Sequence, residues 1–167
     1  GYDVVIFDLF QSKYTGKGQK MWVGDITNRS EVNKVVKDAH VVYNFAAISD
    51  LNEALDKPIK TIEINILGNA NVLEACRHNN VKRYLYASTV YVSSNQGGFY
   101  RCSKVASEQY IEEYGKKYGF ENTILRFGSL YGPRSKEDNG LFRIVKKAID
   151  EKTISYDGSI ESIREYI

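Results

Sequence analysis

The chain of 167 residues contains only two cysteines, two histidines and two prolines. Cys76 and Cys102 are too few for a disulfide framework, so the sequence favours a reducing, cytoplasmic location and two inert packing thiols. Neither cysteine has the spacing of a metal site, and His40 and His78 lie at segment boundaries where solvated side chains are expected. The sequence therefore predicts no bound metal.

The chain also lacks long apolar runs and an excess of charge of either sign. Its 23 basic and 21 acidic residues are interspersed and leave a net charge of +2, which does not favour a nucleic-acid surface. Charged residues or glycine interrupt each apolar run, and the N-terminus has no charged-then-apolar leader. We therefore expect no membrane span and no signal peptide. The 43% of hydrophobic residues suffices for one compact core.

The hydrophobic pattern alternates between strands and helices. Short apolar runs predict strands at residues 4–7, 21–23, 41–45, 81–87 and 123–127. Apolar residues at helical spacing predict helices at residues 28–39, 60–78, 103–118 and 141–151. The first of these resembles a capped helix start at Asn28-Arg29-Ser30-Glu31. Strands separated by helices of this length imply an α/β fold with a parallel sheet and right-handed crossovers.

Two aspartates follow the first two predicted strands, at the edge of an open α/β sheet where ligands bind. Asp8 could accept from both hydroxyls of an adenosine ribose and would repel a 2′-phosphate, which favours NAD over NADP. Asp25 could accept from an adenine amine, and Ile26 could pack on the ring. The alternative is that both aspartates are turn or cap residues.

The third predicted strand ends in Phe45, Ala46 and Ala47. Small residues let the backbone approach a flat ligand closely. The alternative for the two alanines is plain packing. Because polar or small residues follow three strands in succession, the sequence favours a nucleotide site at this edge of the sheet.

Tyr100 and Lys104 stand four positions apart, and in a helix both side chains project from one face, one turn apart. A phenol with its ordinary pKa near ~10 is a poor base at neutral pH. A fixed ammonium one turn away favours the phenolate and brings the group into working range. The alternative is a solvated helix face, because tyrosine and lysine are common in this chain.

Several stretches, taken in order along the chain, match one known family. They are Gly24-Asp25-Ile26, Asn44-Phe45-Ala46-Ala47, Asn65-Ile66-Leu67-Gly68-Asn69, Asn71-Val72-Leu73-Glu74-Ala75, Tyr100 with Lys104, Leu125-Arg126 and Tyr131-Gly132-Pro133-Arg134. In these residues the chain resembles the extended short-chain dehydrogenase/reductase family. Within it, the chain is most similar to nucleotide-sugar epimerases and dehydratases of the UDP-glucose 4-epimerase type.

The resemblance implies a Rossmann-like, doubly wound parallel sheet that is truncated at both ends. Residues 1–135 would form an NAD-binding domain without its first strand and helix, and residues 136–167 would begin a substrate-binding lobe. NAD is the implied cofactor, and a nucleotide-sugar is the implied substrate. Relatives commonly pair as homodimers through two long helices, here residues 60–78 and 103–118.

The resemblance also implies roles for single residues. Tyr100 would be the catalytic base, and Lys104 would bond the nicotinamide ribose and lower the pKa of the tyrosine. Thr89 would hydrogen-bond the reacting hydroxyl, with Ser88 as the alternative if the register slips. Asn65 would lie beside the nicotinamide, although a helix-packing polar residue is an equal interpretation.

Three further residues receive roles from the resemblance. Phe127, at the end of the last predicted strand, would contact the cofactor. Ser129 and Arg164 would contact the substrate, with Arg164 meeting the nucleotide diphosphate. For Arg164 the alternative is a solvated terminal residue.

The chain departs from the family pattern in two respects that bear on function. It begins at Gly1, which matches the family's second strand, and no Gly-x-x-Gly-x-x-Gly turn is present to hold a pyrophosphate, so we expect weak dinucleotide binding. Val90 and Tyr91 follow Thr89 where 4,6-dehydratases carry Asp-Glu. Since water loss needs an acid and a base, dehydration is disfavoured.

The sequence therefore predicts NAD-dependent epimerisation of a nucleotide-activated sugar through a transient 4-keto intermediate. One alternative is an NAD-dependent sugar reductase or dehydrogenase, which would consume external cofactor. Another is a non-catalytic fragment or binding module, favoured by the missing phosphate loop. A sheet without its interior strand would also leave backbone groups unpaired.

Overall fold

The computed structural model describes residues 1–135, 137, 139–155, 159, 161 and 166. The chain forms two compact units, Gly1–Arg126 and Phe127–Ile167. The predicted division into a cofactor-binding domain, residues 1–135, and the start of a substrate-binding lobe, residues 136–167, stays a prediction.

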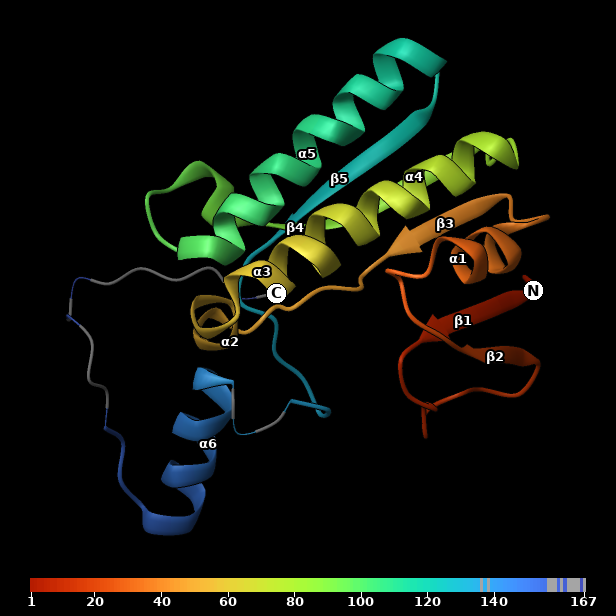
Figure 1. Cartoon of the computed structure of the whole chain (residues 1–167). Helices are drawn as coiled ribbons and strands as arrows, with labels where there is room; N and C mark the ends of the chain where they lie inside the picture. Colours follow the sequence, from red (N-terminus) through yellow and green to blue (C-terminus); the bar gives the residue numbers. More distant parts are fainter. Residues whose placement is uncertain (136, 138, 156–158, 160, 162–165, 167) are drawn as a thin grey trace. The chain divides into compact units, whose positions relative to one another are not determined.

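The strands of the described chain form two sheets (Figure 1). In one, β1 (Val4–Asp8) pairs in parallel with β2 (Gln19–Val23). The other has the order β3 (Val41–Asn44), β4 (Arg83–Thr89) and β5 (Glu121–Phe127), and β3 and β4 pair in parallel. Because β1 and β3 do not pair, the described strands form these two separate sheets and not the single sheet that the sequence predicts.

Three helices of the first unit pack around the strands. α4 (Asn69–His78) and α5 (Gly98–Tyr118) lie side by side along the three-stranded sheet (Figure 1). α1 (Arg29–Val36) packs against α4. As predicted, Asn28 caps α1, and its side-chain oxygen accepts from the Ser30 amide at 3.1 Å.

The predicted helix at 60–78 is three segments of different geometry. They are the α-helix α3 (Pro58–Thr61), the π-helix η1 (Ile62–Gly68) and α4. Gly68 ends the π-helix against Ile26, where an added Cβ would lie 2.8 Å from the isoleucine Cγ2. The short helices α2 (Leu51–Asp56) and η2 (Val90–Ser93, a 3₁₀-helix) were not predicted, because neither is long enough to show a period.

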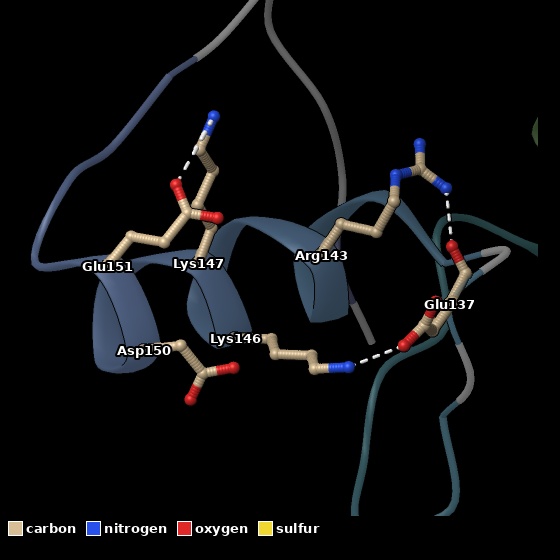
Figure 2. A pocket seen from close by; sticks show the side chains of 6 residues that line it. All are labelled: Glu137, Arg143, Lys146, Lys147, Asp150 and Glu151. Atoms are coloured by element: carbon tan, nitrogen blue, oxygen red, sulfur yellow. Dashed lines mark hydrogen bonds and ion pairs between the residues drawn. The ribbon is translucent and has the colours of Figure 1, made fainter.

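The second unit contains α6 (Gly140–Glu151), which the sequence predicts at 141–151. Asn139 caps this helix by accepting from the Phe142 amide at 3.0 Å. A surface hollow on α6 is lined only by charged side chains (Figure 2). These side chains interact with one another, as in the 2.5 Å bond from Lys146 to Glu137, and none is a predicted site residue.

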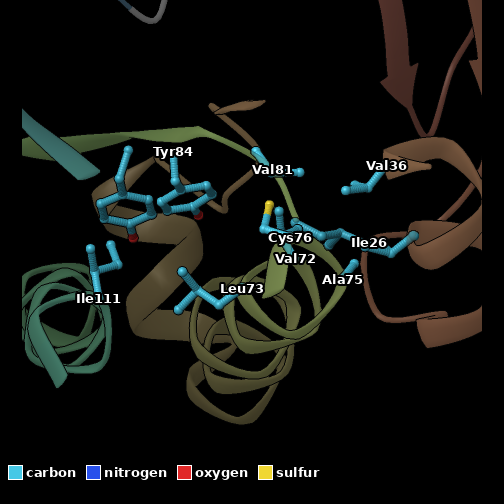
Figure 3. Close-up of a cluster of buried hydrophobic side chains, with 11 residues drawn as sticks. Ile26, Val36, Val72, Leu73, Ala75, Cys76, Val81, Tyr84 and Ile111 are labelled. Carbon is cyan, nitrogen blue, oxygen red and sulfur yellow. The ribbon is translucent and has the colours of Figure 1, made fainter. Parts of the chain in front are cut away.

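The core of the first unit lies between the sheet and α4 and α5 (Figure 3). Tyr84 and Tyr86 reach it from alternate positions of β4, Leu73 from α4 and Ile111 from α5. Truncation of a fully buried Leu73 or Ile111 to alanine would cost about 2–5 kcal/mol. In the described residues, no helix is long and apolar enough to cross a membrane.

Candidate active site

Tyr100 lies in the first turn of α5, because this helix begins five residues before the predicted start at Ser103. Gly97 and Gly98 precede it with φ angles of 97° and 50°, a left-handed conformation that glycine adopts without strain. The tight turn brings Tyr100 into the helix. Tyr100 and Lys104 therefore share one helical face, as their spacing predicts.

Thr89 ends β4 and is buried. Its side chain lies close enough to that of Tyr100 to act on the pKa of the phenol, and its Oγ1 accepts from the Tyr91 amide at 3.3 Å. The structure thus brings together Thr89, Tyr100 and Lys104, the three residues that the sequence proposes as catalytic. Their roles in a reaction stay predictions.

Lys104 is almost fully buried, and its ammonium is held on two sides. Nζ donates to the Ala87 carbonyl at 2.7 Å. It also lies 4.6 Å from the ring centroid of Tyr86 and 5.7 Å from that of Tyr100, so both rings face a cation. Burial lowers the pKa of Lys104 to about 8, against the opposing effect of the Glu108 carboxylate.

The pKa of Tyr100 is raised, chiefly by burial, while the hydrogen bond from Thr89 acts to lower it and Tyr91 to raise it. The Lys104 ammonium, 5.7 Å from the Tyr100 ring centroid, is not among the causes of this shift, and the lowering by Lys104 stays a prediction. A phenol with a raised pKa is protonated at neutral pH, so the predicted role of Tyr100 as a base requires a further positive charge nearby.

Asn65 lies in the π-helix η1, and its buried amide is engaged by the protein. Its Oδ1 accepts from the Ile48 amide at 2.8 Å, and its Nδ2 donates to the Ile48 carbonyl at 3.0 Å and to Ser103 Oγ at 2.8 Å. Ser103 Oγ in turn donates to the Tyr100 carbonyl at 2.7 Å. These contacts fit the packing interpretation of Asn65, and its place beside a nicotinamide stays a prediction.

Asp8 ends β1, and Asp25 follows the end of β2 by two residues at the same edge, since the Gly24 amide donates to the Asp8 carbonyl at 2.9 Å. Each carboxylate also closes a local turn. Asp8 Oδ1 accepts from the Phe10 amide at 3.3 Å, and Asp25 Oδ1 accepts from Thr27 at 2.8 Å. The Thr27 amide bond is the main reason that the pKa of Asp25 is lowered. The second oxygen of each carboxylate accepts no hydrogen bond within the described chain.

The other predicted cofactor residues of the first unit differ in exposure. Ile26 is 8% exposed and belongs to the core, so its side chain packs against the protein. Phe45 is 62% exposed and stacks on Tyr43 at 6.2 Å between ring centroids. Ala46 is exposed and Ala47 half-buried, and their place beside a cofactor stays a prediction.

The remaining predicted residues belong to the second unit. Phe127 and Ser129 are half-buried there, and Ser129 forms a parallel bridge with Tyr166. Arg164 lies outside the described residues. The cofactor role of Phe127 and the substrate roles of Ser129 and Arg164 stay predictions.

Glu108 is a charged residue of this site that the sequence analysis missed. It lies one turn beyond Lys104 on α5 and is buried. Its carboxylate accepts from Ser88 Oγ and from Arg126 Nε and Nη2, the latter two at 3.1 and 2.7 Å. Its spacing in the sequence could have identified it, because Tyr100, Lys104 and Glu108 follow one another at intervals of four residues and so lie on one helix face.

A family model described as the NAD dependent epimerase/dehydratase family matches residues 1–167. Two relatives match over most of this chain. Protein CapI of Staphylococcus aureus is 28% identical over 157 residues, 84% of this chain and 47% of that protein. A putative UDP-glucose 4-epimerase of Methanocaldococcus jannaschii is 28% identical over 187 residues, 99% of this chain and 61% of that protein. The chain thus spans about half to three fifths of these relatives.

A solved structure of UDP-glucose 4-epimerase from Thermotoga maritima with UDP-glucose superimposes with a TM-score of 0.90. It is 19% identical and covers 100% of this chain and 62% of its own. At this identity the likeness concerns the fold alone. It confirms the predicted Rossmann-like α/β fold.

Proposed function

Because the chain belongs to the NAD dependent epimerase/dehydratase family, we propose that it carries the catalytic residues of a nucleotide-sugar epimerase. The reaction proceeds through a transient 4-keto sugar. The observation that carries the proposal is the meeting of Thr89, Tyr100 and Lys104 at the end of β4. In the relatives and structures named above, UDP-glucose epimerases recur, which favours a UDP-sugar as substrate.

Tyr100 acts as the base in this proposal. Its phenol takes the proton from the sugar C4 hydroxyl, and Thr89, which lies beside Tyr100, aligns that hydroxyl. When bound, NAD⁺ supplies the hydride acceptor for the sugar carbon and a positive charge that favours the phenolate. Tyr100 later returns the proton as the sugar is reduced on its other face.

The residues present fit NAD in part. Asp8 and Asp25 offer carboxylate oxygens at the shared edge of β1 and β2, suited to ribose hydroxyls and an adenine amine. Lys104 uses one of its three donors on Ala87, so two remain for a nicotinamide ribose. The Ile26 side chain packs in the core, and its contact with the adenine ring stays a prediction.

Epimerisation is favoured over dehydration by the residues that follow Thr89. Val90 and Tyr91 begin the 3₁₀-helix η2, and neither supplies a carboxyl group to protonate a leaving hydroxyl. A 4,6-dehydratase reaction is therefore not proposed. An NAD-dependent reductase or dehydrogenase remains the alternative and would release an oxidised or reduced sugar.

The test is turnover of UDP-glucose in the presence of NAD, followed by proton NMR for UDP-galactose. Tyr100→Phe is expected to abolish turnover while calorimetry shows NAD binding unchanged. Tyr110→Phe is the matched control, because Tyr110 lies on the same helix and is 51% exposed. Turnover by Tyr100→Phe at the wild-type rate would overturn the assignment, and net NADH formation would favour the dehydrogenase.

We also propose that the protein pairs as a homodimer through α4 and α5. Exposed apolar residues lie on or next to these helices, among them Leu67, Tyr110 and Tyr118. Light scattering is expected to show a dimer that Tyr110→Glu dissociates. The cytoplasmic location also stays a proposal; both cysteines are free thiols, Cys76 buried and Cys102 exposed.

A further inference from the structure

Glu108 joins α5 to two neighbouring strands at once. Its carboxylate accepts from Ser88 Oγ, which lies on β4, and is held by Arg126 on β5 through a two-pronged ion pair at 2.7 and 3.1 Å. The carboxylate is 7% exposed, whereas the Arg126 side chain is 51% exposed. Three charge-assisted hydrogen bonds fix the carboxylate in one orientation.

The contact with Ser88 is the middle one of three between α5 and β4. Lys104 donates to the carbonyl of Ala87, the residue before Ser88, and Tyr100 lies against Thr89, the residue after it. Successive residues of the strand are thus engaged by side chains on one face of the helix, each one turn from the next. This register decides how closely Thr89 approaches Tyr100.

We propose that Glu108 is a positioning residue, which clamps Ser88 and thereby holds Thr89 in register with Tyr100. The inference rests on the proposed function of the Tyr100 site. Glu108 touches no reacting atom in it and acts through the neighbouring strand residue. Arg126 neutralises the buried carboxylate, so that the clamp carries no isolated charge in the core.

The test compares Glu108→Gln with Glu113→Gln, a matched control on the same helix whose carboxylate is 70% exposed and paired with Lys116. Glu108→Gln is expected to lower kcat by about 10- to 100-fold with KM changed less than about twofold, because the reacting groups are displaced and binding is not. Ser88→Ala should reproduce the loss. The double variant with Glu108→Gln should lower kcat little further than either single variant, because both substitutions remove the same contact.

A readout without turnover separates this inference from the proposed function. In protein labelled with 3-fluorotyrosine, the fluorine resonance of Tyr100 is identified by its loss in Tyr100→Phe. It is expected to shift in Glu108→Gln and in Ser88→Ala and to stay unchanged in Glu113→Gln. Absence of turnover in the wild type would contradict the epimerase alone and leave this comparison intact.

The inference is overturned if Glu108→Gln is folded and keeps both the wild-type kcat and the wild-type Tyr100 resonance. It is also overturned if kcat falls only in proportion to the unfolded fraction. Should Glu108→Gln fail to fold, Ser88→Ala decides alone, because it removes the clamp and leaves the Glu108–Arg126 pair in place.

Discussion

The ammonium of Lys104 lies 4.6 Å from the ring centroid of Tyr86, inside the protein. One hydrogen bond, to the Ala87 carbonyl, accompanies this contact. A cation in such a place is poorly hydrated, and its pKa falls from 10.5 to about 8. The protein therefore holds a charge that the unfolded chain would accommodate better.

Lys104→Met is expected to change how stability depends on pH. Between pH 8 and 10.5 the unfolded wild type binds more protons at this lysine than the folded protein does, so wild-type stability rises with pH across this window. The variant lacks this gain. Because it removes a buried charge, the variant should have a higher free energy of unfolding than the wild type at pH 8. This difference should shrink by about 3 kcal/mol from pH 8 to 10.5, as measured by urea unfolding at several pH values.

Other groups titrate in the same range with the opposite sign. Burial raises the pKa of Cys76 to about 12 and that of Tyr86, so both groups lower stability as pH rises above their ordinary values. They are present in both proteins and cancel in the difference. If the free energies of unfolding of Lys104→Met and the wild type change with pH in parallel, the buried charge is contradicted.

Thr89→Val is expected to raise the pKa of Tyr100 further, because it removes the hydrogen bond that acts to lower it. The acidic limb of kcat/KM should move to higher pH, since the phenol must lose its proton to act as a base. Thr89→Ser keeps the hydroxyl and serves as the control. Identical pH profiles for the two variants would argue against a role of the hydroxyl.

Gly97→Ala is expected to disturb the start of α5. The added Cβ would lie 3.0 Å from Arg101 Cβ and 3.1 Å from the Tyr91 ring, at a φ of 97°. A loss of about 2 kcal/mol in unfolding free energy and a fall in kcat should follow, because Tyr100 lies in the first turn. Gly119→Ala, at a φ of 65° with no neighbour within 4 Å, should lose only about 1 kcal/mol and keep kcat.

Glu74→Gln is expected to destabilise the protein by about 1 kcal/mol at neutral pH. Bonds from Arg77 and from the Tyr114 hydroxyl lower the pKa of Glu74 from 4.5 to about 2. This stabilisation is complete above pH 4.5 and is lost as pH falls towards 2, so the two unfolding curves should converge there. Glu63→Gln, which breaks an exposed pair with Lys60, should change stability by less than about 0.5 kcal/mol.

The parts of the fold and site that the sequence predicts correctly depend on local spacing. Tyr100 and Lys104 share a helix face because four residues make about one turn, and Asn28 caps α1 through atoms two residues away. The Rossmann-like fold is likewise confirmed, since alternating strand and helix periods persist through most of the chain.

The parts that the sequence does not predict depend on contacts between distant segments. Ile26 follows a strand end and could face a ligand, yet Gly68 on the π-helix packs directly against it. Glu108 meets Ser88 and Arg126, twenty and eighteen residues away, and no local pattern marks that meeting. Burial likewise decides the pKa of Tyr100, and burial is a property of the folded chain.

The π-helix η1, Ile62–Gly68, also affects how this chain can be aligned with others. A π-helical turn holds about one residue more than an α-helical turn of similar rise, so a relative with a plain α-helix would lack one residue here. Deletion of one residue between 62 and 68 would therefore restore α-helical turns and keep the helix faces on both sides in place, whereas deletion of a residue within α4 would rotate everything before it by about 100°. An ungapped alignment across this segment would then assign Asn65 to a position on the wrong face of the helix.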